Sequence, residues 1–370
     1  MHKLTSHGTH VLRDMYSRPG PIASVYFSLR ATGEEEALPR WHVIARELAH
    51  HGAGDTTIET VRGRVLGAVP GSGVLATFVA GDEVLLSAHM SEADQPDLAR
   101  YGGLPHFLPL LDWLQNRPPY VVALVDRTGA DITVHPGGTA TPVRQAVSGP
   151  DDEIERNAPG GWAQGRYQHR AEDSWEHNAT RVAEVLAPHI RRHAIRLLIL
   201  AGDVRALQYL EKHLPTQIKH KIVIHRVSGG RSPDGSWQLR AEQVADDVRL
   251  AVAAQTALLL GQLDEERRPG GCAVDGVEPT LAALAQGRAR ILLLTPDTGE
   301  PRMAWYGPGP ADVAAEPELL ERAGLHPEGG PLVDVAVRSA LLSGAGVRVL
   351  APTGGPEAPL EGIGALCRFP

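Results

Sequence analysis

The middle of the chain alternates short apolar runs with longer amphipathic segments, and this alternation constrains the fold more than any other feature of the sequence. Residues 195–200 are largely apolar, which is typical of a buried parallel strand. Residues 171–193 and 204–214 flank this run with apolar positions at helical spacing. A strand pattern at 221–227 and a long helical pattern at 241–262 follow. Strands that alternate with helices predict an α/β layered sheet.

Two breaks divide the chain into three predicted domains. The first is Asn116-Arg117-Pro118-Pro119, and the second is a charged and glycine-containing stretch at 265–271. At 370 residues, the chain is also too long for one ordinary core. We therefore expect an N-terminal α+β domain over 1–117, a central α/β domain over 118–265 and a C-terminal α/β sandwich over 270–370.

The two outer domains show patterns of their own. The first predicts a strand at 22–29, a helix at 41–51 with Trp41, Ile44 and Leu48 on one side, and a hairpin of runs 73–79 and 83–87 joined by Ala80-Gly81-Asp82. The last predicts helices at 277–285 and 334–343 and strands at 289–294 and 346–350, around a proline- and glycine-rich insert at 295–331.

Composition excludes several classes of protein. The formal net charge of −8 disfavours a generic basic nucleic-acid binder, although a local basic stripe stays open. Two cysteines, Cys272 and Cys367, cannot build a disulfide framework or a four-cysteine zinc site. The first residues lack the apolar core of a signal peptide, and the apolar runs at 195–201 and 251–260 are too short to span a membrane. We expect a cytoplasmic protein without a membrane partner.

Paired histidines are candidate metal ligands in this sequence. His189 and His193 are four residues apart on a predicted helix, a spacing that places them on one face. They lack an HExxH context, and Arg191 and Arg192 lie between them, so a solvated helix end is favoured over a metal site. The chain also has no GxSxG elbow and no Walker A loop, and we expect no metal and no cofactor.

One segment, residues 157–170, combines features of an RNA-binding element. Adjacent glycines let a backbone approach another surface closely, arginines meet phosphates, and aromatic rings stack on bases. Residues 157–170 are expected in a loop before a helix. A tryptophan among polar residues is also unusual without a partner. The candidate RNA-binding residues are Gly160, Gly161, Trp162, Gln164, Arg166, Tyr167, His169 and Arg170.

From Tyr120 onward the chain resembles the archaeal–eukaryotic class-one release factors and Pelota, and especially their bacterial relatives. These relatives include the ribosome-hibernation factor Balon and Vms-type peptidyl-tRNA hydrolases. The resemblance rests on the strand–turn–strand pattern at 121–134, on Gly160-Gly161 followed by Arg166-Tyr167 and a long helix, and on the segments 282–294 and 334–340. It covers about two-thirds of the chain and implies a three-domain release-factor-like architecture with a ribonuclease H-like central domain.

The departure from the family pattern matters for function. In release factors a glutamine directly follows the two glycines and helps water attack the peptidyl-tRNA ester, whereas here Trp162 stands in that place and Gln164 follows two residues later. Because an amide has no useful acid or base strength, Gln164 would act by position alone. The first domain shows no stop-codon-reading motif.

The resemblance therefore leaves two hypotheses. In the first, the chain binds the A site and the ribosomal RNA of an inactive ribosome during stress, and the C-terminal domain contacts a translational GTPase such as EF-Tu. In the second, the chain is a peptidyl-tRNA hydrolase of ribosome rescue, with tRNA as partner and Gln164 as the catalytic residue. Trp162 favours the first.

Overall fold

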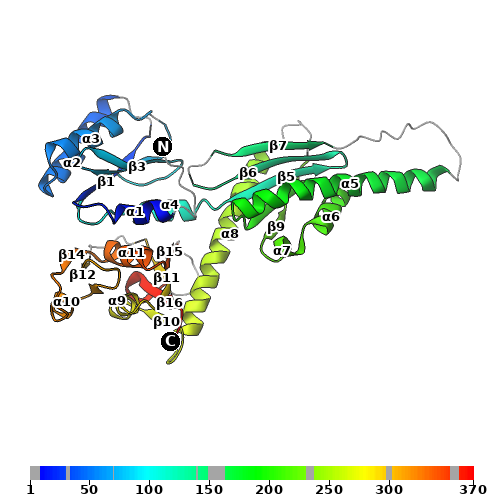
Figure 1. The fold of residues 1–370 in the computed structure, drawn as a ribbon. Helices are drawn as coiled ribbons and strands as arrows, with labels where there is room; N and C mark the ends of the chain where they lie inside the picture. The colour runs from blue at the N-terminus through cyan, green and yellow to red at the C-terminus, as the bar shows by residue number, and fades with distance from the viewer. Residues whose placement is uncertain are drawn as a thin grey trace. The chain divides into compact units, whose positions relative to one another are not determined.

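The computed structural model describes residues 9–30, 34–69, 71–138, 141–148, 163–230, 237–296, 302–350 and 358–370. Contacts within the chain divide it into two units, Arg117–Val252 on the one hand and Met1–Asn116 with Ala253–Pro370 on the other. The segments expected as the first and last domains thus lie in a single unit. Each unit is described by itself (Figure 1).

The unit Arg117–Val252 is built on a five-stranded sheet in the order β7-β6-β5-β8-β9. Strands β5, β8 and β9 pair in parallel, and β6 and β7 add antiparallel strands at one edge, as mixed α/β sheets often do. Its elements are β5 Tyr120–Asp126, β6 Gly129–His135, β7 Val143–Ser148, α5 Ala163–Arg192, β8 Leu197–Gly202, α6 Val204–His213, α7 Thr216–Lys219, β9 Val223–Arg226 and the first part of α8 Trp237–Glu266.

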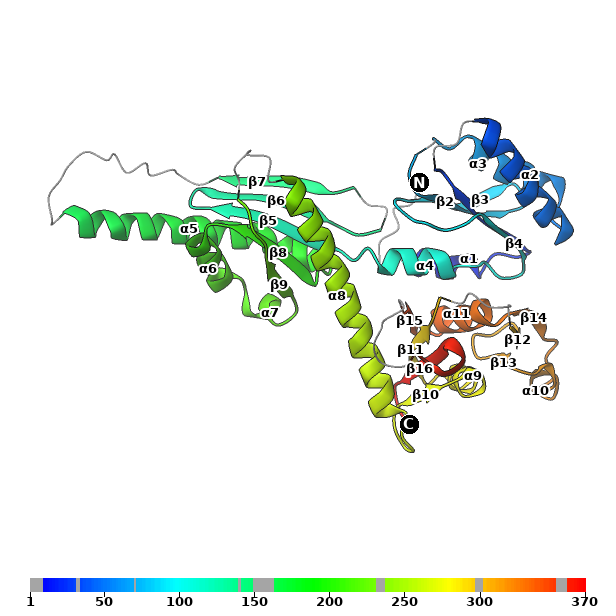
Figure 2. The same ribbon diagram turned by 180° about the vertical axis from the view of Figure 1, so that it is seen from behind.

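Helices cover both faces of this sheet. Helices α5 and α6 pack on one face, where Val121, Leu198 and Leu186 are fully buried. The first part of α8 covers the opposite face, where Val244 and other apolar residues of α8 pack over β5 and β8 (Figure 2). The sheet is buried on both sides because β5 and β8 alternate their side chains between two apolar layers.

The end of β8 requires glycine. Gly202 has a φ of +138°, and a Cβ atom there would lie 1.7 Å from the carbonyl oxygen of Val125 on the neighbouring strand. The next residue, Asp203, donates its backbone N–H to the same carbonyl at 3.1 Å. Its side chain accepts hydrogen bonds from the backbone N–H groups of Arg205 and Ala206, which caps α6. The turn from strand to helix is therefore set by two adjacent residues.

The N-terminal part of the other unit is an antiparallel sheet in the order β3-β2-β1-β4 with helices on both faces. Alternate residues of β1 face opposite sides. Val25 packs with Trp41 and Leu48 on one side, and Tyr26 packs on the other side in the cluster that holds Phe107. The elements are α1 Thr9–Met15, β1 Ile22–Ser28, α2 Glu34–His50, α3 Asp55–Leu66, β2 Val74–Ala80, β3 Glu83–Met90, β4 Leu98–Gly102 and α4 Leu108–Gln115.

The C-terminal part of the same unit holds a sheet in the order β10-β16-β11-β15 and a small sheet in the order β13-β12-β14. Leu292 faces the large cluster that also holds Phe107, and Leu293 faces Leu260 and Leu263 at the end of α8. The elements are β10 Ala273–Asp275, α9 Val277–Ala285, β11 Ala289–Leu294, β12 Met303–Tyr306, β13 Val313–Ala314, α10 Pro317–Glu321, β14 Glu328–Pro331, α11 Leu332–Leu342, β15 Gly346–Val349, a 3₁₀ turn at Leu360–Gly362 and β16 Ile363–Cys367.

The mixed α/β fold class is confirmed, and the differences from expectation have local causes. Helix α5 begins at Ala163, eight residues before the predicted start, because its first three turns are mostly polar and lack the large aliphatic side chains of an apolar face. The proline- and glycine-rich insert, for which no strand was predicted, contains the small sheet, whose strands are too short to show alternation. Outside this insert, elements α1, α3, β4, α4, β7, α7, β10, the 3₁₀ turn and β16 have no counterpart in the sequence prediction. In the described part of the chain, no helix combines the length and apolarity needed to cross a bilayer.

Candidate nucleic-acid interface

The predicted RNA-binding residues fall on and before the start of α5. Gly160, Gly161 and Trp162 lie outside the described residues, and Trp162 directly precedes the first residue of α5 in the chain. The remaining five, Gln164, Arg166, Tyr167, His169 and Arg170, all belong to the first eight residues of that helix. Their expected place in a loop is therefore wrong, because the helix continues through them.

The second half of α5 forms the anchored base of the helix. Ala179, Val182, Leu186 and Ile190 are at most 4% exposed and lie in the core against the sheet. These positions follow the three- and four-residue spacing of one helical face. Their burial holds the helix on the sheet from residue 179 onward.

Polar contacts add to this anchoring. Lys212 Nζ and His213 Nε2 of α6 lie 2.7 and 2.8 Å from Oε1 of Glu176. The hydrogen bond from Lys212 is the main reason that the pKa of Glu176 is lowered, and the same contact raises the pKa of Lys212. On the other side, Gln145 Oε1 of β7 lies 3.0 Å from His189 Nε2. Helix α5 is thus tied to both α6 and β7.

The first half of α5 extends beyond the end of the sheet. In Figures 1 and 2 the helix runs past the ends of β5, β6 and β7, with its N-terminal end farthest from them. The 16 residues 163–178 precede the apolar base, which corresponds to about 24 Å at about 1.5 Å per residue. Positions 166, 169 and 170 share one face by helical spacing. The helix is therefore an arm that carries the candidate residues at its outer end.

The other end of α5 holds the paired histidines. The rings of His189 and His193 stack with centroids 6.4 Å apart, and partial burial and the neighbouring Arg192 lower the pKa of His193. Arg191 and Arg192 are exposed in the last turn, where cations interact favourably with the helix dipole. Within the described ranges no three potential ligands gather around a common point.

Sequence reasoning missed the residues that position the arm. Glu176, Gln145 and Asn178 have partners 36 to 51 residues away, so no local pattern marks them. Asn178 is 2% exposed, and its side-chain nitrogen donates to the carbonyl oxygen of Arg127 at 2.9 Å. A polar residue on the apolar face of a helical pattern is the one sequence feature that would have singled it out.

Comparison with known proteins identifies the central part of the chain. Bacterial archaeo-eukaryotic release factor family 2 matches residues 119–268. Two uncharacterized proteins of Mycobacterium tuberculosis, Rv2629 of strain H37Rv and MT2704 of strain CDC 1551, are each 27% identical over 376 residues, which cover 97% of this chain and 96% of theirs.

Among solved structures, Pelota from an archaeal ribosome-bound assembly with ABCE1 is 14% identical, with a TM-score of 0.41 and coverage of 99% of this chain and 96% of its own. Saccharomyces cerevisiae Dom34 is 9% identical, with a TM-score of 0.40 and coverage of 100% and 94%. The archaeal translation termination factor aRF1 is 15% identical, with a TM-score of 0.25 and coverage of 99% of both chains. Residues 119–268 are thus similar to bacterial archaeo-eukaryotic release factor family 2, in agreement with the sequence resemblance.

Proposed function

We propose that this chain is a ribosome-binding translation factor that occupies the A site, contacts ribosomal RNA and keeps the ribosome inactive. The observation that carries the proposal is the residue that follows the two glycines: Trp162 stands where release factors carry the glutamine that promotes hydrolysis. An indole offers a stacking face for a base and no group that activates water. The match of residues 119–268 to a release factor family supports a role in translation.

The shape of α5 suits this role. Its base is anchored by Ala179, Val182 and Leu186, whereas the 16 residues before that base carry the motif away from the sheet. A confined RNA site is reached more easily by a narrow helix than by a loop held against a sheet. Arg166, His169 and Arg170 near the outer end supply basic groups for phosphates.

The proposed partners are suggested by the descriptions of two similar solved structures. Pelota is described in a ribosome-bound assembly with ABCE1, and Dom34 is described as a termination-like factor of RNA quality control that interacts with Hbs1. By analogy we propose that the residues of the C-terminal segment 270–370 contact a translational GTPase such as EF-Tu. In this proposal the protein works in the cytoplasm, in response to stress.

The binding proposal is tested by co-sedimentation with 70S ribosomes. Loss of one stacked base costs about 1–3 kcal/mol, so Trp162→Ala weakens binding by about tenfold or more, whereas Trp162→Phe keeps an aromatic face and most of the affinity. The wild-type chain also inhibits cell-free translation in proportion to the ribosomes it occupies. Equal co-sedimentation of all three proteins would contradict the proposal.

The second candidate function is peptidyl-tRNA hydrolysis, and Gln164 is the observation that favours it. Gln164 is the second residue of α5, so its backbone is helical, and it would have to position water from the helix terminus. The test is release of peptide from ribosome-bound peptidyl-tRNA. Release that Gln164→Ala abolishes and Gln164→Asn reduces would establish a hydrolase, and release at the background rate would exclude one.

A further inference from the structure

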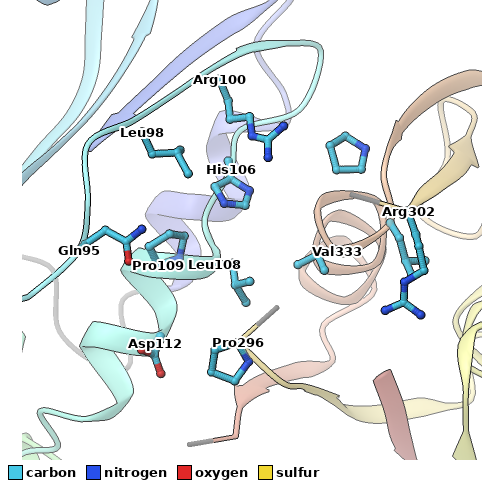
Figure 3. A pocket seen from close by; sticks show the side chains of 12 residues that line it. Gln95, Leu98, Arg100, His106, Leu108, Pro109, Asp112, Pro296, Arg302 and Val333 are labelled. Carbon is cyan, nitrogen blue, oxygen red and sulfur yellow. The ribbon is translucent and has the colours of Figure 1, made fainter. Parts of the chain in front are cut away.

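A pocket in the unit formed by Met1–Asn116 and Ala253–Pro370 has no role in the proposed function (Figure 3). Its volume is about 180 Å³. This is well above the roughly 10–15 Å³ that one water needs and below the roughly 300–1,000 Å³ of sites for whole drug-sized ligands. Leucines and prolines form much of its wall, and the polar side chains Arg100, His106, Asp112 and Arg302 line it as well. The pocket therefore suits a small polar group.

His106 is held in one orientation from three sides. Its Nδ1 atom lies 2.9 Å from Oδ1 of Asp334, a carboxylate that is only 2% exposed. Its backbone N–H donates to Ser24 Oγ at 3.0 Å, and its carbonyl oxygen accepts from the hydroxyl of Tyr26 at 2.7 Å. Because a carboxylate only accepts, Nδ1 carries the proton of that bond, and Nε2 is the ring nitrogen that stays available to the pocket.

Arg100 brings a positive charge without a partner. It lies on β4, where its backbone pairs with Ser24 of β1, and it is half-buried; its guanidinium makes no hydrogen bond or ion pair with any residue that the structure describes. Arg40 contacts the same sheet but is engaged with Asp97 and the carbonyl of Ser28. In Figure 3 the guanidinium of Arg100 lies on the same side of the pocket as His106, at the opposite end from Asp112. A half-buried guanidinium offers five N–H donors, in a geometry that matches an oxyanion.

The first turn of α11 forms another wall of the pocket, through Pro331, Leu332 and Val333. The positive end of a helix dipole therefore borders the pocket, and Asp334 in the same turn offsets part of it. Arg302 lines the pocket too, but its guanidinium donates to the carbonyl oxygen of Glu361. Arg100 and His106 are the two basic side chains on one side of the pocket, and the carboxylate of Asp112 lies at the opposite end (Figure 3).

We infer that this pocket binds the phosphate group of a small phosphorylated molecule, with Arg100 and His106 as its ligands. Phosphate fits better than carboxylate because of His106. An ionised carboxylate only accepts hydrogen bonds, whereas a phosphate with a second pKa near about 6 both accepts and donates, so it can pair with Nε2 of His106 in either role. The pocket volume admits the phosphate and leaves the remainder of the ligand outside.

The test uses inorganic phosphate as the probe and the full-length chain. Thermal unfolding and titration calorimetry are compared in phosphate and in sodium chloride of equal ionic strength. The wild-type chain binds phosphate saturably and is stabilised by it. Arg100→Met keeps the aliphatic stem but weakens phosphate binding by about tenfold or more, as expected for loss of a charge-assisted hydrogen bond.

Matched controls separate this site from general charge effects. Arg64→Met removes an exposed arginine of the same unit and leaves phosphate binding unchanged. Arg100→Lys keeps the positive charge and retains part of the phosphate affinity. Circular dichroism verifies that Arg100→Met is folded. Absence of saturable binding at millimolar phosphate, or equal binding by the wild type and Arg100→Met, would overturn the inference.

A second arm separates a small ligand from a polynucleotide. A nucleoside monophosphate competes with inorganic phosphate, whereas a short RNA without terminal phosphates does not. An RNA that binds in an Arg100-dependent way while the monophosphate fails to compete would also overturn the inference, since the pocket would then contact a backbone phosphate. None of these measurements involves the ribosome, so their outcome does not depend on whether the proposed function is correct.

Discussion

The side-chain nitrogen of Asn178 donates to the carbonyl oxygen of Arg127 at 2.9 Å, which fastens α5 to the turn between β5 and β6. Asn178 lies at the point where the anchored base of α5 begins, and its side chain is almost completely buried. This contact joins the start of the anchored base to the sheet, in addition to the contact between His189 and Gln145 of β7.

Removal of that contact is expected to loosen the base of the arm. Asn178→Ala removes this hydrogen bond of an almost completely buried side chain, which costs about 0.5–1.5 kcal/mol of unfolding free energy. Glu184→Ala, at an exposed position of the same helix, changes it by less than about 0.5 kcal/mol. Urea unfolding of both variants measures the difference, and equal stability of the two would contradict the anchoring role.

A substitution on the apolar face of α5 is expected to lower the free energy of unfolding by a larger amount. Leu186 is fully buried between α5 and the sheet, so Leu186→Ala costs about 2–5 kcal/mol through lost burial and the cavity it leaves. Leu250 of α8 is 62% exposed, and Leu250→Ala is close to neutral. Denaturant midpoints distinguish the two, and a small effect at Leu186 would mean that the base of α5 is not packed as described.

The N-terminal cap of α6 can be tested with a conservative substitution. Asp203 accepts from the backbone N–H groups of Arg205 and Ala206 at 2.9 and 3.1 Å, so Asp203→Ala lowers stability by about 1 kcal/mol. Asp203→Asn retains an accepting side-chain oxygen and most of the stability. Thermal unfolding of both variants checks this, and the capping role fails if alanine and asparagine behave alike.

His135 makes the stability depend on pH in a defined window. Burial, and then the charge of Arg144, lower its pKa from 6.5 to about 4, and its ring stacks on Tyr120. Between about pH 6.5 and 4 the unfolded chain takes up a proton at this residue and the folded chain does not, so its contribution to stability falls as the pH falls.

A variant isolates this contribution from the other histidines. His135→Phe keeps an aromatic ring against Tyr120 and removes the titration, so the variant loses less unfolding free energy than the wild type between pH 7 and pH 4.5. Urea unfolding at the two pH values measures the slopes. Parallel pH profiles would show that His135 does not titrate in the way described.

The sequence by itself determined the elements that carry a regular apolar pattern. The run that became β8 and the helical pattern that became α6 were predicted because burial on one side repeats at the period of each element. The release-factor resemblance also came from local residues, Gly160-Gly161 with Arg166-Tyr167, which need no tertiary contact to be recognised.

Tertiary structure alone decided the elements without such a pattern. Five of the six positions of β7 are exposed, so this edge strand shows no alternation, and the first turns of α5 are mostly polar. The contacts that build the sites are decided in the same way. His106 and Asp334 are 228 residues apart, and Asn178 and Arg127 are 51 apart. Hydrophobic periodicity carries information only about residues that are close in the sequence. These pairs form only when folding brings distant segments of the chain together.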